Sequence, residues 1–384
     1  MTRRTIALTE RRTRVVKLPR TEAYFLLAHA RHLIEVIPAF ERGTYRLTPR
    51  GYVGFIDGPA ARYAIGPKIP WPNVQMLLGL SSEASREAFE PADGLLTVLA
   101  TAFAERLEAV TRTGLAAGYG EAEAVSEFLR GKLRTADQMR DAATGAFPGH
   151  FHIDEPVFDL HTPWNRVPKA TATTLLRYDL SRELRQRIEA AIVPLAEVAG
   201  EPVTDADFAA AVAEPRAAHY QPLLEVCRIL LDGLTCADPL GTGNGAFLID
   251  LGQAFERYLA TALDRAFETH PDWWVEAHPT FAVGPTELKP DVLIRKDGEP
   301  WAVLDAKWKT ATLDPADLHQ ILAYATLTGA ARVALVYPGR EDERAYFSAS
   351  DGRVRVSVYR IRVVGTAEEL AQSVEKLARS VRNV

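Results

Sequence analysis

Three charged residues in the last third of the sequence have the types and spacing for metal-assisted hydrolysis. Asp291 follows a proline at the start of an apolar run, and Asp305 and Lys307 close the next apolar run as Asp-Ala-Lys. Carboxylate oxygens are ligands that Mg²⁺ and Mn²⁺ prefer. We therefore expect Asp291 and Asp305, on neighbouring strands, to bind one divalent cation, Mg²⁺ or Mn²⁺. Lys307 is two residues beyond Asp305, so it shares a strand face with it and can stabilise charge on an attacked phosphate.

Other residues can support this set. Glu256 lies on a predicted amphipathic helix and can provide a third carboxylate, and the backbone carbonyl of Ala306 can provide a further oxygen ligand. Gln320 and Tyr324 are one helical turn apart on one face. They can contact the phosphate of the cleaved strand or position Lys307. The alternative interpretation is a strand that ends in solvated charges, with Tyr324 in the core.

The acid-x-lysine spacing is weak evidence by itself, because Glu287-Leu288-Lys289 has it too. The surroundings distinguish the two matches. Glu287 lies beside a predicted turn. Asp305 ends an apolar run, with Pro-Asp upstream and Gln-x-x-x-Tyr downstream.

Alternating strands and helices must position these residues. Apolar periodicity, capping residues and turn residues predict them in the last third of the chain. The predicted helices cover residues 247–270 and 314–329, and the predicted strands cover residues 273–283, 287–298, 299–310 and 331–339.

The rest of the chain divides at changes of pattern. Residues 1–92 predict a β-rich module with a helix over 21–37 that Pro38 stops. Residues 93–236 predict a mainly helical region, with helices over 94–118, 121–142 and most of 169–232 and extended segments over 146–168. Residues 237–384 predict a mixed sheet flanked by helices. The fold class is therefore α+β or α/β with several domains. We interpret Asn165 as a residue that satisfies a buried turn.

Composition limits the function classes. The net charge is −5, so no global basic field indicates nucleic acid, although a local groove is compatible with it. Only two cysteines occur, and no secretory signal or membrane span is evident, so we expect a cytoplasmic protein. No Gly-x-x-x-x-Gly-Lys-Ser/Thr motif occurs, so any nucleotide-driven motor must be another subunit.

The ordered motifs resemble a known nuclease group. Pro-Asp, Asp-Ala-Lys and Gln-x-x-x-Tyr in this order resemble the RecB-like branch of the PD-(D/E)XK nucleases. Further segments resemble the McrC family, the nuclease subunits of McrBC-type modified-cytosine restriction systems. These segments are GYVGFIDG, IGPKI, RGKLRTADQMR, HIDEPVFDLHTPWNRVPKAT, FLIDLGQAFERYL, LKPDVLIRKDGEPWAVLDAKWK and HQILAYA.

The resemblance implies a PD-(D/E)XK endonuclease domain over 237–384. It assigns the nuclease residues to Asp291, Asp305 and Lys307, and supporting roles to Glu256, Gln320 and Tyr324. It also implies cleavage of double-stranded DNA, with or without modified bases, in complex with a McrB-like AAA+ GTPase hexamer. In that family the N-terminal region docks onto the GTPase ring.

The resemblance makes residues 1–92 a candidate partner-binding module, and cations there can act like an arginine finger. The candidates lie on or near a hairpin predicted in this module and are Arg46, Arg50, Arg62 and Lys68. For each of them, a solvated residue of that hairpin is the favoured alternative. Two other functions stay open. The chain can act mainly as an adaptor that activates an AAA+ motor, or as a standalone nuclease.

Overall fold

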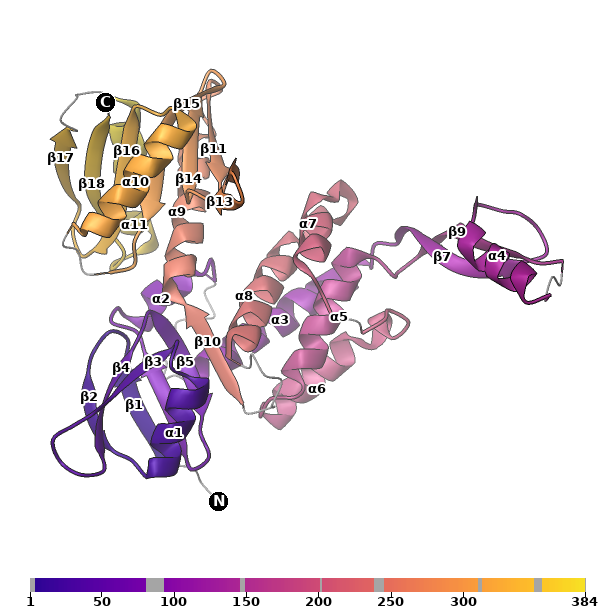
Figure 1. Cartoon of the computed structure of the whole chain (residues 1–384), viewed down its shortest axis with the longest axis horizontal. Coiled ribbons are helices and arrows are strands. Elements are labelled where there is room, and N and C mark those ends of the chain that lie inside the picture. The colour runs from indigo at the N-terminus through magenta and orange to yellow at the C-terminus, as the bar shows by residue number, and fades with distance from the viewer. Residues whose placement is uncertain are drawn as a thin grey trace. The chain divides into compact units, whose positions relative to one another are not determined.

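The chain is described here by a computed structural model, which covers residues 4–80, 93–145, 149–200, 202–237, 245–309, 313–348 and 354–383. These residues form two compact units. The first unit combines Met1–Gly94 with Cys236–Val384, and the second is Leu95–Thr235. The predicted boundaries near residues 92 and 237 lie in or beside segments outside the described residues. The mixed helix and strand architecture is confirmed (Figure 1).

The first sheet of the first unit joins two distant parts of the sequence. Its strand order is β1-β6-β5-β10, in which β1 and β6 are parallel and the other pairs antiparallel. The strands are β1 (Arg4–Thr9), β6 (Ala61–Gly66), β5 (Tyr52–Asp57) and β10 (Ala246–Asp250). The strand from the C-terminal part therefore forms an edge of the N-terminal sheet.

The start of the predicted helix over 247–270 is wrong, because its first residues form β10. Ala246, Phe247, Leu248 and Ile249 are buried against β5, so the apolar run pairs as a strand. Helix α9 (Leu251–Phe267) begins only after Asp250, whose carboxylate accepts hydrogen bonds from the backbone N–H groups of the first helical turn.

A second small sheet completes the N-terminal module. Its order is β2-β4-β3, with β2 (Arg14–Lys17), β4 (Thr44–Pro49) and β3 (Ile34–Pro38). Helix α1 (Arg20–His29) packs on β3, and α2 (Trp71–Leu77), later in the module, contacts α9. The prediction of one helix over 21–37 is wrong in its second half. Ile34 and Val36 are buried on one face while β3 pairs with β4, so strand pairing overrides the helical pattern.

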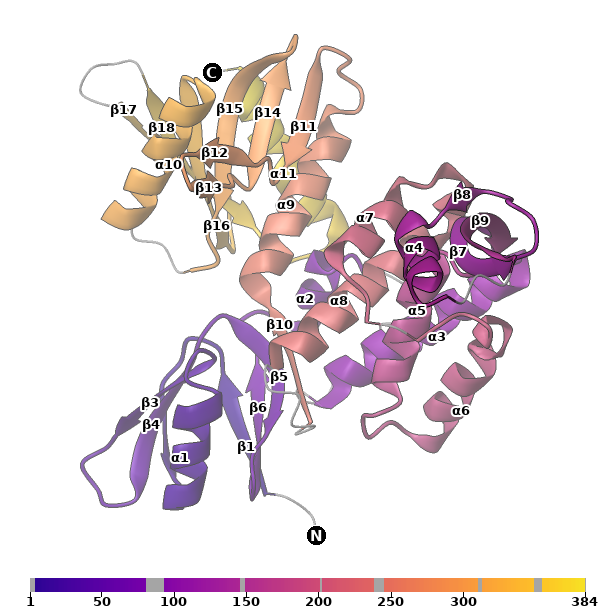
Figure 2. The same cartoon turned by 45° about the vertical axis from the view of Figure 1, so that its right-hand side comes forward.

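The larger sheet of the first unit has the order β11-β14-β15-β16-β18-β17. Its β15–β16 and β16–β18 pairs are parallel and the others antiparallel, so the sheet is mixed. Helix α10 packs on β15 and β16, α9 packs on β11 and β15, and α11 packs on α9 and β18 (Figure 2). The elements are β11 (Trp273–Ala277), β14 (Val292–Lys296), β15 (Glu299–Ala306), α10 (Pro315–Thr328), β16 (Arg332–Gly339), β17 (Glu343–Ser348), β18 (Arg355–Arg362), α11 (Ala367–Arg382) and the hairpin β12 (Phe281–Val283) and β13 (Thr286–Leu288).

The second unit is mainly helical and carries one small sheet. Its helices are α3 (Asp93–Thr113), α4 (Thr135–Ala143), α5 (Pro163–Leu175), α6 (Arg182–Ala191), α7 (Asp205–Ala213) and α8 (Gln221–Ala237), with short 3₁₀ turns at Val193–Leu195 and Pro215–Tyr220. The sheet order is β7-β9-β8, with β7 (Gly118–Ser126), β9 (Phe151–Asp159) and β8 (Lys132–Leu133). No helix in the described ranges is long and apolar enough to cross a bilayer.

Two predictions for this unit are wrong. The helix over 121–142 is a strand at its start, because β7 pairs with β9 along its whole length. The extended segment to 168 is helical from Pro163, since proline is favoured in a first helical turn. The interpretation of Asn165 is confirmed. Its side chain is fully buried, donates to the carbonyls of Ala116 and Leu160, and accepts from the Tyr220 hydroxyl at 2.7 Å.

Candidate active site

Asp291 and Asp305 lie opposite each other where two strands of the larger sheet meet. Val292 pairs with Leu304 in the antiparallel β14–β15 ladder, and one further step brings Asp291 opposite Asp305. Directly opposed residues of an antiparallel pair share a sheet face. A hydrogen bond joins the ends of the two strands, because the Ala306 N–H donates to Asp291 Oδ2 at 2.7 Å.

Lys307 lies at the centre of a chain of polar contacts. Its Nζ is 2.6 Å from Asp305 Oδ2 and donates to Gln320 Oε1 at 3.0 Å. Gln320 Nε2 donates to the Tyr324 hydroxyl at 2.9 Å, which donates to the Lys289 carbonyl at 3.1 Å. Two residues of α10 thus hold the ammonium group in place. The positioning of Lys307 is the role that we propose for Gln320 and Tyr324 on the basis of these contacts.

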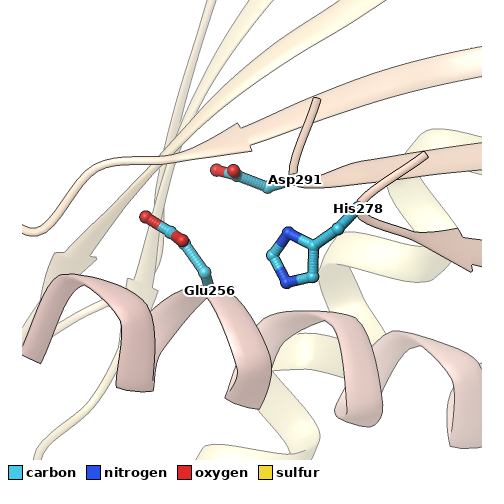
Figure 3. Close-up of side chains that lie close together, drawn as sticks. All are labelled: Glu256, His278 and Asp291. Carbon is cyan, nitrogen blue, oxygen red and sulfur yellow. The ribbon is translucent and has the colours of Figure 1, made fainter. Parts of the chain in front are cut away.

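Glu256 approaches Asp291 from helix α9, and an unpredicted residue joins them. One ligand atom each from Glu256, His278 and Asp291 lie within 4.8 Å of one another. Figure 3 shows the imidazole ring and the two carboxylates gathered between the helix and the strand ends. Asp305 is not a member of this cluster, and it instead contacts Lys307. No motif in the sequence marks His278, because the turn that brings it to the acids comes from strand pairing.

The carboxylates of the site resist ionisation. Burial and the nearby Glu256 charge raise the pKa of Asp291 to about 7. Burial and the Asp291 charge raise the pKa of Asp305 to about 6, and burial also raises the pKa of Glu256. The carboxylates around Lys307 outweigh its burial, so the pKa of Lys307 is raised and the group is charged. The site therefore gathers negative charge that one lysine only partly offsets.

The match to a protein-family model decides the family. The model of the McrBC 5-methylcytosine restriction system component matches residues 47–338, which is most of the chain. The chain belongs to the McrBC family. A comparison with curated proteins gives no match.

Solved structures of McrBC assemblies are similar in fold. A chain in a half-complex of Thermococcus gammatolerans McrB AAA+ hexamers with bound McrC has a TM-score of 0.54 and 17% identity, with 99% of each chain covered. A chain of the Thermococcus gammatolerans McrBC complex has a TM-score of 0.42 and 17% identity, covering 68% of this chain and 88% of that one. The first of these likenesses shows a shared fold.

The donors of this McrBC-family chain fit the divalent cation that the resemblance implies. Buried carboxylates with raised pKa values are stabilised in their charged form by a nearby cation. Asp305 is 1% exposed, and its Oδ2 atom has a close ionic contact but no well-directed hydrogen bond. Asp291 uses Oδ2 for the Ala306 N–H, which leaves Oδ1 for a ligand. The Ala306 carbonyl stays a predicted further ligand.

The four candidate cations of the N-terminal module have different surroundings. Arg46 on β4 and Arg50 after it are exposed. Arg62 makes a two-pronged contact with the buried Asp57, at 2.6 and 2.8 Å. Lys68 lies over an indole ring of the larger-sheet domain, at 4.7 Å from its centroid. Arg62 and Lys68 thus have contacts within the chain, whereas Arg46 and Arg50 face solvent.

Proposed function

We propose that this McrBC-family protein is the endonuclease subunit of a GTP-dependent restriction system and hydrolyses DNA phosphodiester bonds with Mg²⁺ or Mn²⁺. The observation that carries the proposal is the opposition of Asp291 and Asp305 beside the charged Lys307. Glu256 adds a third carboxylate from α9. The mixed sheet with flanking helices is compatible with a PD-(D/E)XK fold, which we propose for residues 237–384.

The proposed chemistry divides between the acids and the lysine. A divalent cation held by Asp291, Glu256 and Asp305 would polarise the phosphoryl group and offset charge on the leaving oxygen. The oxygen of water bonds to phosphorus, one phosphorus–oxygen ester bond breaks, and the departing oxygen takes a proton. Lys307 can stabilise the additional negative charge on the phosphate and orient the water. The hydrogen bond from Lys307 to Gln320 limits the directions in which its ammonium can point.

We also propose a McrB-like AAA+ GTPase hexamer as the partner and double-stranded DNA, with or without modified bases, as the substrate. Family membership and the fold shared with a chain from a McrB–McrC assembly support the partner. In this proposal the N-terminal module binds the GTPase and stimulates it. The adaptor function is therefore an additional activity of the same chain.

Two substitutions test the nuclease proposal in the complex with the partner, GTP and Mg²⁺. Asp305→Asn removes a charge from the metal site, and Lys307→Met removes the ammonium group while it keeps most of the side-chain volume. Each should lower the rate of DNA cleavage by about 100-fold or more, the effect of losing one transition-state contact of about 3 kcal/mol. GTPase stimulation by both variants should persist.

The chain offers a matched control in its second acid-x-lysine sequence. Glu287, on β13, and Lys289, just after it, form an exposed ion pair at 3.0 Å. Glu287→Gln combined with Lys289→Met should leave cleavage unchanged. Normal cleavage by both Asp305→Asn and Lys307→Met would overturn the proposed nuclease site.

A further inference from the structure

His278 lies at a turn of the larger sheet, beside the two acids of the proposed metal site. We infer that His278 is a ligand of the divalent cation that Glu256 and Asp291 hold, so that the site offers a nitrogen donor as well as oxygens. This inference rests on the proposed function, because it concerns the cation of the same site. It adds a residue and a preference among metal ions to that proposal.

Strand pairing brings His278 to Asp291. His278 follows β11 directly, and the last residue of β11, Ala277, pairs with the first residue of β14, Val292. The backbone N–H of His278 donates to the Asp291 carbonyl at 2.9 Å. The positions of the two residues are therefore coupled through the backbone.

The backbone of His278 adopts a conformation that is uncommon for a residue with a side chain. Its φ is 49°, in the left-handed region. Such a conformation persists where the surroundings enforce it, and it is frequent at ligand sites. In Figure 3 the ring lies over α9 with the carboxylates of Glu256 and Asp291 beside it.

The spacing of the ligand atoms suits one ion. The atoms of Glu256, His278 and Asp291 lie within 4.8 Å of one another. Two ligands that are each about 2.1 Å from a cation are at most about 4.2 Å apart. Three ligand atoms cannot all lie opposite one another around one ion, so contraction of their separations by about an ångström would bring all of them to bonding distance.

Within the described ranges, the side chains of Glu256 and His278 have no hydrogen bond or ion pair. Glu256 is half-buried and faces another carboxylate, an arrangement that repels unless a cation lies between them. His278 is exposed, so its ring is open to an ion from solvent. A shared cation would satisfy the acid and the imidazole together.

A nitrogen ligand changes which ion the site prefers. Mg²⁺ binds mainly oxygen and keeps several waters, whereas imidazole is a better ligand for transition metals. The inferred ligand set therefore favours Mn²⁺ over Mg²⁺ more strongly than carboxylates alone would. Loss of the imidazole should weaken Mn²⁺ binding by about 10–100-fold. Loss of a residue that only hydrogen-bonds to a metal ligand already has an effect of about this size, and loss of a direct ligand should be at least as large. The effect on Mg²⁺ binding should be smaller.

The test uses Mn²⁺ bound to the purified full chain, without DNA or partner. Electron spin-echo spectroscopy should detect a nitrogen nucleus coupled to the bound Mn²⁺, and labelling of histidine with ¹⁵N should change its frequency. His278→Gly and His278→Asn should abolish this signal. Glycine and asparagine both tolerate a positive φ, so the turn is preserved. His32→Gln, at another exposed histidine, is the matched control and should keep the signal.

The outcomes separate the inference from the proposed function. Bound Mn²⁺ without a nitrogen signal, a signal that persists in both His278 variants, or no Mn²⁺ binding by the chain would overturn the inference. If the complex with the partner cleaves DNA in any of these cases, the proposed function stands. If the histidine signal is present and depends on His278 but the complex cleaves no DNA, the inference stands and the nuclease proposal fails.

Discussion

The indole N–H of Trp308 donates a hydrogen bond to Glu10 Oε2 over 2.9 Å, although the two residues are almost 300 positions apart in sequence. Both side chains are buried, and Glu10 Oε1 also accepts from the Lys68 N–H. Trp308 follows Lys307 directly and contacts Phe255, the neighbour of Glu256, with ring centroids 5.5 Å apart. The contact of Trp308 with Glu10 of the N-terminal module therefore lies next to Lys307 and Glu256, two residues of the proposed nuclease site.

Trp308→Phe should destabilise the first unit and slow DNA cleavage. Phenylalanine keeps most of the ring packing but has no N–H, so a buried carboxylate oxygen of Glu10 loses its donor. Such a loss costs about 1–3 kcal/mol. Urea unfolding followed by tryptophan fluorescence would measure it, and a cleavage assay would show whether Lys307 is also misplaced.

Trp274→Phe is the matched control for that change. Trp274 is on β11 and is 44% exposed, so its substitution should affect stability little. If Trp308→Phe unfolds at the same urea concentration as the wild type, the buried hydrogen bond contributes no measurable stability.

The stability of the metal-free protein should decrease as the pH rises from about 4 to 8. The pKa of Asp291 is raised to about 7 and that of Asp305 to about 6, whereas an unfolded aspartate titrates near its ordinary value of about 3.9. Between these values the folded protein binds more protons than the unfolded chain. The free energy of unfolding therefore falls with increasing pH.

Asp291→Asn should consequently be more stable than the wild type in EDTA, with a difference smallest near pH 4 and largest above pH 7. Thermal denaturation across this range would measure it. Addition of Mn²⁺ at pH 8 should raise the melting temperature of the wild type more than that of the variant. Asp272→Asn, at an exposed position, should show neither effect. A wild-type stability that increases with pH in EDTA would contradict the raised pKa values as the dominant effect.

Gln320→Ala and Tyr324→Phe should each reduce cleavage by about tenfold, because each interrupts the contacts that position Lys307. The double variant should lose less than the product of the two effects, since Tyr324 acts on Lys307 through Gln320. Single-turnover cleavage rates would measure the coupling. Thr326→Ala on the same helix is the control, and fully multiplicative effects would refute a shared pathway.

Arg46→Glu and Arg50→Glu should weaken GTPase stimulation by the chain, most clearly at low salt, because both side chains are exposed. Arg62→Ala should instead lower stability, since it leaves the buried Asp57 without its guanidinium partner. Arg31→Glu, another exposed position in the module, controls for net charge. These substitutions are better tests than deletion of residues 1–90, which would also remove the strand that β10 pairs with. Normal stimulation by both glutamate variants would exclude Arg46 and Arg50 from this role.

Strand pairing explains where the predictions from sequence are wrong. The predicted helices extend into residues 34–38, 118–126 and 246–250, and each of these ranges forms a strand whose partner is a separate segment of the chain. The local periodicity of a segment contains no information about a pairing partner that is distant in sequence. The strands Glu299–Ala306 and Arg332–Gly339 and the helix carrying Gln320 and Tyr324 agree with the prediction, because alternation, caps and turn residues are local signals. The predicted strands over 273–283 and 287–298 are each divided into two strands, because their halves pair with different partners.

The sequence by itself determined the types and order of the proposed nuclease residues, and the order of its motifs indicated the McrBC family. It placed Asp305 and Lys307 on one strand face, because that relation depends only on the two-residue repeat of a strand. Only the tertiary structure brought His278 beside Asp291 and joined Trp308 to Glu10. These relations depend on which strands pair and how a turn aims a side chain, and neither is encoded in any short stretch of residues.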